Sequence, residues 1–398
     1  MNLQAMLRQT MEAEKRRPAE PVLHSTDCWE RQTVRPLSEF PGAFSLSVDS
    51  VALMETADLP ASLDPARILY LDTETTGLAG GAGTVAFEVG LGQLRRDGFV
   101  ITQLVMRDYP EEVFLLEKVA QALTFCDAVC TFNGRTFDIP LLRDRMVMQR
   151  IDPSCLDKPH IDLLHIARRV YKLRLRQCNL SRLEELLLGI RREDDLPGAQ
   201  VPERYFQYLK TGNFDLLSDV LRHNEQDIAS LCVLLNHMAS VYQEPEQLRF
   251  SEDLYAMGSG LERYQHHEEA RRCWEMVGSG SLHAQSQLRL AASWRRAGER
   301  DKAVAIWQSL TRTGEGGITP WVELAKHYEH TVRDYQSARA CVRRAIAALA
   351  DPAAAFWMDA RTVQEEKNAL QYRYARLERK LREAESAGSA EGEEEAWV

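Results

Sequence analysis

Two acidic residues separated by a single residue, Asp72 and Glu74, are the first candidates for chemistry in this chain. They follow the apolar run 68–71, which predicts a buried strand. Residues i and i+2 of a strand point to the same face, so the two carboxylates lie side by side. Like charges held this close repel each other unless a cation binds between them, and their hard oxygens favour Mg²⁺ or Mn²⁺. The pair therefore indicates a divalent-cation site, although an isolated pair of this kind is more often a turn that faces water.

A third acidic residue, Asp138, occupies a matching context further along the chain. The apolar run 128–132 predicts a strand, a glycine-containing turn follows at Asn133, and Asp138 stands at the entry of a helix expected over 139–149. Taken alone, Asp138 is also a good helix N-cap, which would explain it without any chemistry.

A fourth acidic residue, Asp227, lies inside a long helix expected over about 215–242. It stands four positions after His223, and positions i and i+4 share one face of a helix, so the two side chains project together. A histidine and an aspartate at this spacing more often form a surface hydrogen bond than a catalytic pair. The three motifs together predict a functional site much more specifically than any one of them alone.

These side chains need a scaffold, and the apolar pattern supplies one. Three adjacent strands followed by alternating helices and strands indicate an α/β domain, with a mixed sheet and helices packed on its faces. The predicted strands cover 68–71, 84–94, 99–106 and 128–132, and the predicted helices cover 111–123, 139–149, 160–173, 180–188 and 215–242.

The character of the chain changes after Pro245. Apolar strands vanish, and the pattern at 270–274 recurs at 303–307 and, more loosely, at 338–342. This spacing is close to the roughly 34 residues of tetratricopeptide units, which are helix–turn–helix pairs. We therefore expect tetratricopeptide-like helical repeats and a capping helix over 251–385, with a protein partner as their ligand.

In this order and on this alternation of strands and helices, the motifs resemble the DEDD superfamily of proofreading-type 3′–5′ exonucleases. The stretches DTETTGL, FNGRTFDIPLL and HNEQD, with a helical-repeat region behind them, are most similar to the YprB-type ribonuclease-H-like proteins of bacteria. The resemblance is strong over roughly 66–240 and looser over the repeats. It implies a ribonuclease-H-like α/β domain at 66–243 followed by the all-α region.

The resemblance also implies roles for the polar residues. Asp72, Glu74, Asp138 and Asp227 correspond to the acids that hold two divalent metal ions, Mg²⁺ or Mn²⁺, and hydrolyse phosphodiester bonds of single-stranded DNA or RNA. His223 corresponds to the residue that orients or deprotonates the attacking water. The sequence departs from the superfamily here: one branch has Tyr four positions before the last acid, the other has His five before it, and this chain has His at the tyrosine spacing.

Further residues are candidates for contact with the strand. The turn after the first strand would leave room for a 3′-terminal nucleotide, Phe137 could stack on a base, and a basic cluster at 168–176 could contact phosphates. Each also has a plainer interpretation: a hairpin loop, core packing and a solvated helix face. The candidate substrate-binding residues are Thr75, Gly77, Leu78, Asn133, Phe137, Arg169 and Arg174.

Composition narrows the class of protein. A net charge of −10 over 398 residues argues against a general nucleic-acid coat protein. The eight cysteines are scattered without a zinc spacing, which favours reduced thiols and a cytoplasmic location, and no segment predicts a signal peptide or a membrane partner. Residues 1–65 read as an irregular N-terminal arm and 386–398 as an acidic, disordered tail.

Two alternatives remain open at this level. The ribonuclease-H-like domain could bind nucleic acid as a scaffold without cutting it, which the unusual spacing of His223 allows and the intact set of four acids disfavours. The same fold and metals also serve structure-specific endonucleases. The choice between DNA and RNA depends on contacts near the 2′ position, which no motif here reports.

Overall fold

The computed structural model describes residues 27–39, 46, 48–54, 63–77, 83–192, 196–350 and 359–394. The chain divides into two compact units. The first comprises Met1–Ile166 with Asn179–Ser240, and the second comprises Ala167–Cys178 with Val241–Val398.

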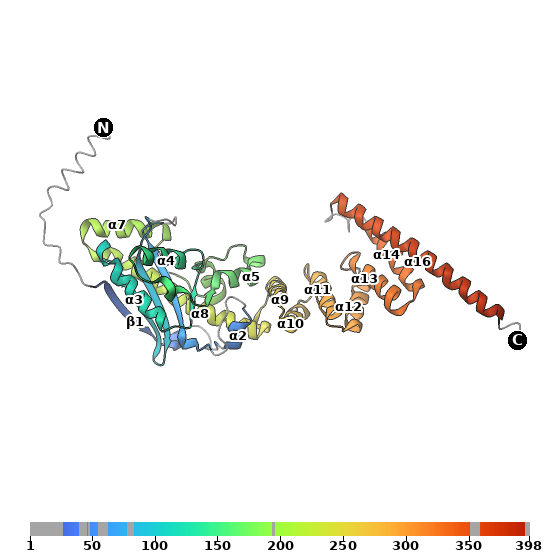
Figure 1. Cartoon of the computed structure of the whole chain (residues 1–398), viewed down its shortest axis with the longest axis horizontal. Coiled ribbons are helices and arrows are strands. Elements are labelled where there is room, and N and C mark those ends of the chain that lie inside the picture. The colour runs from blue at the N-terminus through green and yellow to red at the C-terminus, as the bar shows by residue number, and fades with distance from the viewer. Residues whose placement is uncertain are drawn as a thin grey trace, which may run out of the picture. The chain divides into compact units, whose positions relative to one another are not determined.

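A six-stranded mixed sheet forms the centre of the first unit (Figure 1). The strand order is β1-β4-β3-β2-β5-β6, with antiparallel pairing from β1 to β2 and parallel pairing from β2 to β6. This arrangement confirms the predicted α/β class with a mixed sheet and flanking helices. The strands are β1 (Trp29–Arg35), β2 (Ile68–Thr75), β3 (Ala86–Arg95), β4 (Gly98–Val105), β5 (Ala128–Thr131) and β6 (His160–Asp162).

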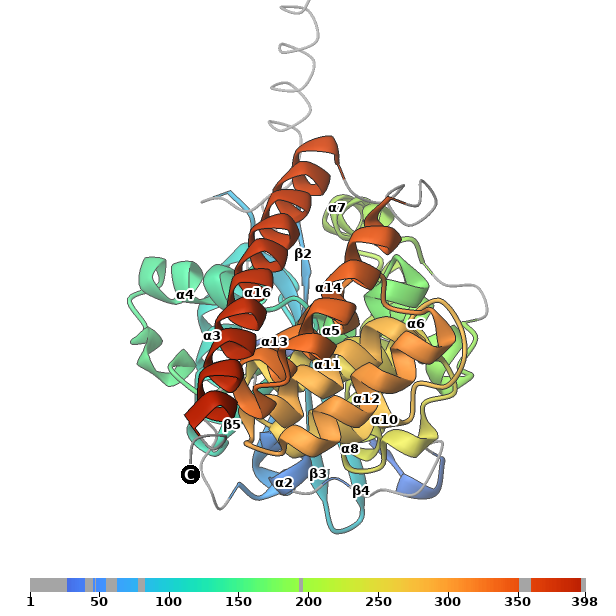
Figure 2. The ribbon, with the colours of Figure 1, turned by 90° about the vertical axis from the view of Figure 1, so that its right-hand side faces the viewer.

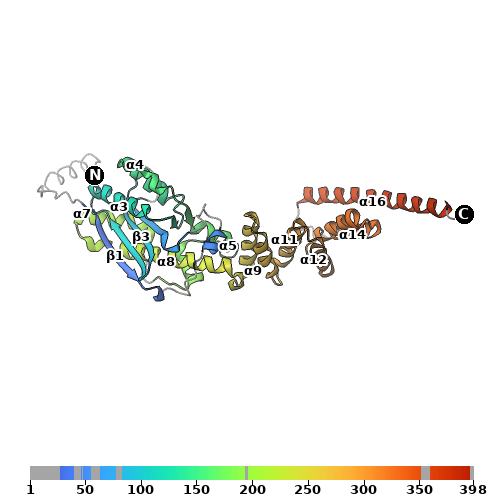
Figure 3. The same cartoon turned by 60° about the horizontal axis from the view of Figure 1, so that its bottom comes forward.

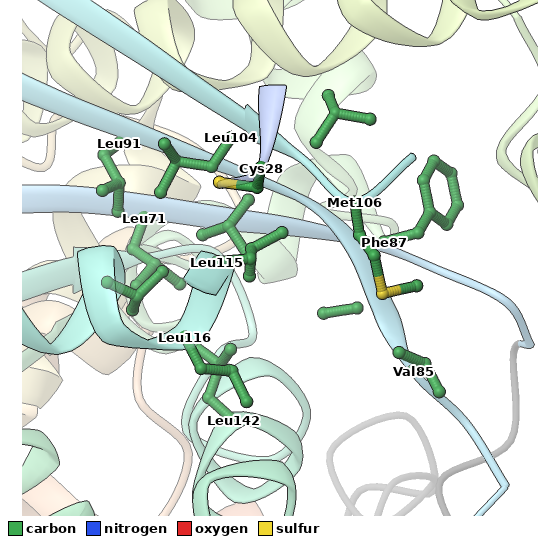
Figure 4. Packing of buried hydrophobic residues seen from close by; sticks show 14 of the residues in the cluster. Cys28, Leu71, Val85, Phe87, Leu91, Leu104, Met106, Leu115, Leu116 and Leu142 are labelled. Carbon is green, nitrogen blue, oxygen red and sulfur yellow. The ribbon is translucent and has the colours of Figure 1, made fainter. Parts of the chain in front are cut away.

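Helices α3, α4, α7 and α8 lie beside this sheet (Figures 1 and 3). The helices of this part of the chain are α2 (Val48–Ala52), α3 (Glu112–Thr124), α4 (Asp138–Met148), α5 (Leu163–Leu175), α6 (Leu180–Leu183), α7 (Val201–Thr211) and α8 (Ser218–Gln243). Apolar side chains of the strands pack on α3 and α4 to form the main core. Figure 4 shows part of it: Leu71, Phe87, Leu91 and Leu104 from the strands, Leu115 and Leu116 from α3, and Leu142 from α4.

Two sequence-based expectations are wrong in this unit, and one helix was not predicted. Trp29–Arg35, expected in an irregular arm, is strand β1 and pairs with β4 along its whole length, while residues 1–26 of that arm lie outside the described part. His160–Asp162, expected to begin a helix, is the short parallel strand β6. Helix α7 was not expected at all. A strand with alternate half-buried polar residues and a strand of three residues carry too little apolar pattern to be recognised.

Two glycines of β3 allow α8 to approach the sheet closely. A Cβ atom at Gly90 would lie 2.2 Å from Oδ1 of Asn224, and one at Gly92 would lie 2.7 Å from Cγ2 of Ile228. Both neighbours belong to α8. Glycine is therefore required at these positions because the helix that carries His223 and Asp227 lies directly over β3.

We expect the Gly90→Ala variant to be less stable by about 1–3 kcal/mol, the usual cost of overpacking. The added methyl group must push Asn224 and with it the N-terminal half of α8. Urea denaturation of the purified chain measures the effect. Gly83→Ala is the matched control, since a Cβ there meets no atom within 4 Å and should change the stability by less than about 0.5 kcal/mol. Equal unfolding midpoints for the two variants would contradict the close contact.

The second unit is helical. Consecutive helices from α9 to α14 contact one another, and α16 packs along α14 (Figure 2). The core shared by α12, α13, α14 and α16 includes Trp307, Leu324, Val342 and Leu377. The helices are α9 (Ser251–Arg263), α10 (His267–Glu275), α11 (His283–Arg296), α12 (Arg300–Thr313), α13 (Thr319–His327), α14 (Tyr335–Leu349) and α16 (Ala360–Glu394).

This helical content confirms an all-α region after the sheet domain, whereas its assignment to tetratricopeptide-like repeats stays a prediction. The tail expected to be disordered from 386 is corrected in part, because α16 continues to Glu394. Residues 386–394 include Gly388 and Gly392, which are poor helix formers, so this part of the helix does not follow from residue propensity. Within the described part of the chain, every helix is too short or too polar to cross a membrane.

Candidate functional site

Strand β2 presents its two acids to α8. Leu69 and Leu71 belong to the core packed on α3, so the alternation of a strand turns Asp72 and Glu74 to the opposite face. There, the side-chain amide of Asn224 donates a hydrogen bond to Oδ2 of Asp72 over 3.1 Å. The first two predicted site residues therefore lie under the helix that carries the last two.

Asp138 reaches the same strand from the other side. It is the first residue of α4, and Thr73 Oγ1 of β2 donates a hydrogen bond of 2.6 Å to its Oδ1. The preceding residue, Phe137, stands in the N-cap position, so capping is not what places Asp138 here. Only 4% of Asp138 is exposed. Strand β2 thus meets α8 with one face and the start of α4 with the other, and it brings the three motifs together.

Asp227 and His223 lie one turn apart on α8 and face Glu74. The Nε2 atom of His223 is 3.8 Å from Oε1 of Glu74 and 3.7 Å from Oδ2 of Asp227. Oδ1 of Asp227 accepts a hydrogen bond from Nη2 of Arg192, which also pairs with the buried Glu184. Nη1 of the same arginine lies 3.4 Å from Nδ1 of His223. Arg192 and Glu184 were not among the expected site residues.

The four acids repel one another in a buried setting. Burial and the charges of Asp227 and Asp138 raise the pKa of Asp72 well above its usual value. Burial, Asp72 and nearby carboxyls do the same to the pKa of Glu74. For Asp138, burial raises the pKa to about 6 despite the hydrogen bond from Thr73. Burial also raises the pKa of Asp227, although the Arg192 charge opposes it. Each group favours protonation because its charge is poorly balanced.

This donor set fits a divalent cation in its chemistry. Carboxylate oxygens are the ligands that Mg²⁺ and Mn²⁺ prefer, and positive charge would relieve the repulsion that raises these pKa values. Among the described residues, however, no three histidine, cysteine, aspartate or glutamate side chains are already arranged to hold one ion. The acids are gathered but not set as a ligand shell, and Asp227 has Arg192 as its counter-ion.

A second polar layer lies behind Asp72. Gln103 Nε2 of β4 donates to Oε1 of Glu88 over 2.8 Å and to the carbonyl oxygen of Leu221 over 2.7 Å. It also lies 3.4 Å from Oδ1 of Asn224, whose amide group holds Asp72. Glu88 is paired directly opposite Glu74 across the sheet. The sequence carries a signal for this layer, since Glu88 and Gln103 are polar residues inside apolar strands.

Glu88 gives a pH-dependent prediction. Burial raises its pKa to about 8, so the folded protein holds a proton that the unfolded chain, with an ordinary glutamate, releases. This contribution to stability is complete below the unfolded pKa of about 4.3 and is lost as the pH rises towards 8. We expect Glu88→Gln to remove that loss, so that its free energy of unfolding relative to wild type increases by about 1 kcal/mol or more between pH 5 and pH 8. Urea denaturation with a chelator present measures it.

Glu117→Gln serves as the control for Glu88→Gln. Glu117 is an exposed residue of α3, so its neutralisation should leave the pH dependence of wild type unchanged. Parallel pH profiles for wild type and Glu88→Gln would show that Glu88 is ionised in the folded protein and that this account of the layer is wrong.

Of the substrate-binding residues expected near β2, the structure describes Thr75 and Gly77. Thr75 is buried, and its hydroxyl donates to the carbonyl oxygen of Gly77 over 2.8 Å. A Cβ atom at Gly77 would make only an ordinary van der Waals contact, at 3.5 Å from Oγ1 of Thr84. Leu78 lies outside the residues that the structure describes. Thr75 therefore shapes the end of the strand, and contact of these residues with a nucleotide stays a prediction.

The turn before α4 is held by a residue of β6. Asn133 has a left-handed backbone with φ of 68°, and its N–H donates to Oδ1 of Asp162 over 2.9 Å. The same oxygen accepts from the N–H of Leu164, as expected for a helix cap. Asn133 Oδ1 accepts from the hydroxyl of Thr136. Asn133 thus fixes the turn that delivers Asp138, while Phe137 is half-buried beside it.

The two arginines expected to contact the strand belong to the second unit and are engaged there. Arg174 forms an ion pair of 2.7 Å with the buried Asp253 and lies over the ring of Phe250. Arg169 lies over the ring of Tyr264 at 4.7 Å from its centre. These contacts give both side chains a packing role, and phosphate contact by them stays a prediction.

Comparisons with known proteins identify the family of the chain. The RNase_H_2 family, described as RNase_H superfamily, matches residues 69–239. The protein YprB of Bacillus subtilis (strain 168) is 30% identical over 368 residues, which cover 89% of this chain and 86% of that protein. The chain belongs to the YprB family of the ribonuclease H superfamily. In this YprB family member, the superfamily match contains Asp72, Glu74, Asp138 and Asp227, and the similarity to YprB reaches well beyond it.

A solved structure was also found. The family B DNA polymerase from the hyperthermophilic archaeon Pyrobaculum calidifontis is 14% identical, with a TM-score of 0.38. The match covers 59% of this chain and 29% of the polymerase chain.

Proposed function

We propose that the first unit is a metal-dependent 3′–5′ exonuclease that hydrolyses phosphodiester bonds of single-stranded DNA or RNA. The observation that carries this proposal is the meeting of Asp72, Glu74, Asp138 and Asp227, which come from three separate elements and raise one another's pKa values or are buried beside one another. Folding gathers like charges at a cost in stability, and such an arrangement is typical of a functional site. Membership of the ribonuclease H superfamily supports hydrolysis of nucleic acid.

Each residue has a role in this proposal. The four carboxylates would hold two divalent ions, Mg²⁺ or Mn²⁺, with Asp227 released from Arg192. When bound, such ions activate water and stabilise the charge that develops on the phosphate and the leaving oxygen. His223 positions the water or accepts its proton, since its Nε2 atom faces Glu74 and Asp227 and only 14% of its side chain is exposed. Asn224 and Thr73 fix the orientation of Asp72 and Asp138.

One observation favours a second candidate, a scaffold that binds nucleic acid without cutting it. Arg192 already neutralises part of the acid cluster through Asp227, as a permanent structural cation would. In either case we assign the second unit to protein binding. Its three successive helix pairs, α9–α10, α11–α12 and α13–α14, support the prediction of tetratricopeptide-like repeats.

The deciding experiment compares labelled oligonucleotides of DNA and RNA with purified protein in Mn²⁺, in Mg²⁺ and in a chelator. An exonuclease releases a 3′-terminal label first, shortens a 5′-labelled strand stepwise, and stops in the chelator. Release of an internal label before either end would indicate an endonuclease. Binding of the strand without any cutting in either metal would favour the scaffold and overturn the proposal.

A further inference from the structure

Arg192 is built into the acid site. Its Nε and Nη2 atoms form a two-point ion pair with Glu184, at 2.6 and 2.7 Å, and Nη2 also donates to Asp227. The exposed fractions of the three side chains are 10% for Arg192, 1% for Glu184 and 15% for Asp227. Glu184 alone is enough to hold the guanidinium in place, because a carboxylate and an arginine match in two parallel hydrogen bonds. The contact with Asp227 is therefore an additional one that Arg192 can give up.

The same arginine lines a cavity of about 370 Å³ that opens on the surface of the first unit. Arg182 and Arg191 line it too, together with Asn179, Ser181 and one acid, Glu185. Arg182 and Arg191 are exposed and form no ion pair with any other residue that the structure describes. Besides Arg192, which is paired with Glu184 and Asp227, the cavity has two guanidinium groups against the one carboxylate of Glu185. This balance favours an anion, and arginine is the side chain best suited to phosphate.

These two observations share one residue, and from that residue we propose a coupling that rests on the function proposed above. In the protein without metal, Arg192 is the counter-ion of Asp227. When a strand is bound, Arg192 keeps Glu184 and turns to a backbone phosphate in the cavity lined by Arg182 and Arg191. Asp227 then becomes available to the divalent ion. The cavity is thus a phosphate subsite next to the acid cluster, and Arg192 is a positioning residue that links strand binding to metal binding.

Two consequences follow from competition and linkage. A metal ion that needs Asp227 must displace Arg192, so its apparent affinity is reduced by the fraction of molecules in which the pair is closed. A strand that draws Arg192 away must strengthen metal binding, and metal must strengthen strand binding by the same factor.

Calorimetric titration with Mn²⁺ alone tests the first consequence. Arg192→Gln should bind Mn²⁺ about tenfold more tightly than wild type, as expected when a closed competitor is removed. Arg191→Gln is the matched control: it lines the same cavity without an ion pair to the acids, and it should bind Mn²⁺ like wild type. Because Arg192→Gln leaves the buried Glu184 without this cation, the double variant Glu184→Gln/Arg192→Gln is measured beside it and should show the same gain. Equal Mn²⁺ affinity in wild type and in both Arg192 variants, each folded by circular dichroism, would overturn the inference.

The second consequence is tested with a phosphorothioate oligonucleotide that resists hydrolysis. In wild type, the oligonucleotide should tighten Mn²⁺ binding, and Mn²⁺ should tighten oligonucleotide binding measured by fluorescence anisotropy. Arg192→Gln should lose this mutual effect. Arg191→Gln should bind the strand more weakly but should retain the mutual effect. A mutual effect of unchanged size in Arg192→Gln would overturn the coupling.

The outcomes separate this inference from the function on which it rests. If wild type shortens strands but Arg192→Gln changes neither Mn²⁺ affinity nor the coupling, the inference alone fails. If the Mn²⁺ and coupling differences are found and no strand is cut, the inference holds and the exonuclease proposal fails. If Mn²⁺ binds to none of the proteins, both are overturned.

Discussion

The Asp72→Asn variant is expected to lose hydrolysis of the strand by roughly 10³-fold or more, and yet to unfold at a higher urea concentration than wild type when no metal is present. The loss of activity follows from the central place of Asp72 in the site. Its carboxyl interacts with those of Asp227 and Asp138, and an amide oxygen at this position carries no charge to attract a divalent ion.

The gain in stability of Asp72→Asn follows from the same charges. Burial and the neighbouring carboxylates raise the pKa of Asp72 in the folded protein, so folding favours the protonated acid. Its contribution to stability is present below the unfolded pKa of about 3.9 and is lost as the pH rises through the folded value. Without metal at neutral pH, repulsion between these carboxylates therefore destabilises wild type. Asparagine removes this repulsion and can still accept the hydrogen bond from Asn224.

Activity on a 3′-labelled strand in Mn²⁺ and urea denaturation in a chelator measure the two effects together. The control is Asp144→Asn, because Asp144 is an exposed aspartate of α4 and should change neither quantity. Addition of Mn²⁺ should raise the unfolding midpoint of wild type more than that of Asp72→Asn. An Asp72→Asn protein that is inactive and less stable than wild type at neutral pH would mean that a structural defect, and not loss of charge, explains the inactivity.

The parts of this site that could be predicted from sequence are those with a local pattern. An apolar run followed by Asp72 and Glu74 predicts both the strand and the face on which the acids lie. The i, i+4 spacing of His223 and Asp227 predicts their common direction on α8. Each of these side chains is placed by its own element, and the structure agrees with the direction of each.

The missed residues are those placed by distant parts of the chain. Arg192 lies in a charged, irregular segment that reads as solvated, and its partners stand 8 and 35 positions away. The position of Asn224 could not be predicted, because an asparagine in this helix looks exposed in the sequence. Nothing in the local pattern shows that Gly90 of β3 leaves space for α8 to lie against the strand. Likewise, β1 exists because β4 offers an edge to pair with, which the sequence of β1 does not reveal.

The second large effect is expected in the helical unit, at Glu329. This residue lies in the short π-helix Tyr328–Val332 after α13, and its side chain is fully buried. It accepts hydrogen bonds from three cations of α16. The contacts are Arg373 at 2.9 Å, Arg376 at 2.8 and 2.7 Å, and Lys380 at 3.1 Å. Burial alone would raise the pKa of Glu329, but the hydrogen bonds from Arg376 and Lys380 outweigh it and lower the pKa to about 2.

Glu329→Ala should loosen α16 from α13 and α14 by about 2–4 kcal/mol. Removing one partner of a buried ion pair costs about 3–5 kcal/mol, and the cations recover part of that because they can turn to solvent. In wild type, this contribution is complete above the unfolded pKa of about 4.3 and is lost as the pH falls towards 2. Amide hydrogen exchange along α16 at neutral pH should therefore be faster in Glu329→Ala, and wild type should approach the variant only in acid.

Glu378→Ala separates the buried cluster from ordinary surface pairing on the same helix. Glu378 pairs with Arg339 of α14 at 2.7 Å, but about a third of each side chain is exposed. Such a pair contributes only about 0–1 kcal/mol, so its loss should leave exchange along α16 nearly unchanged. If Glu329→Ala were as mild as Glu378→Ala, the apolar contacts of Leu370 and Leu377 would be sufficient to hold α16, and the buried charge cluster would add nothing to its docking.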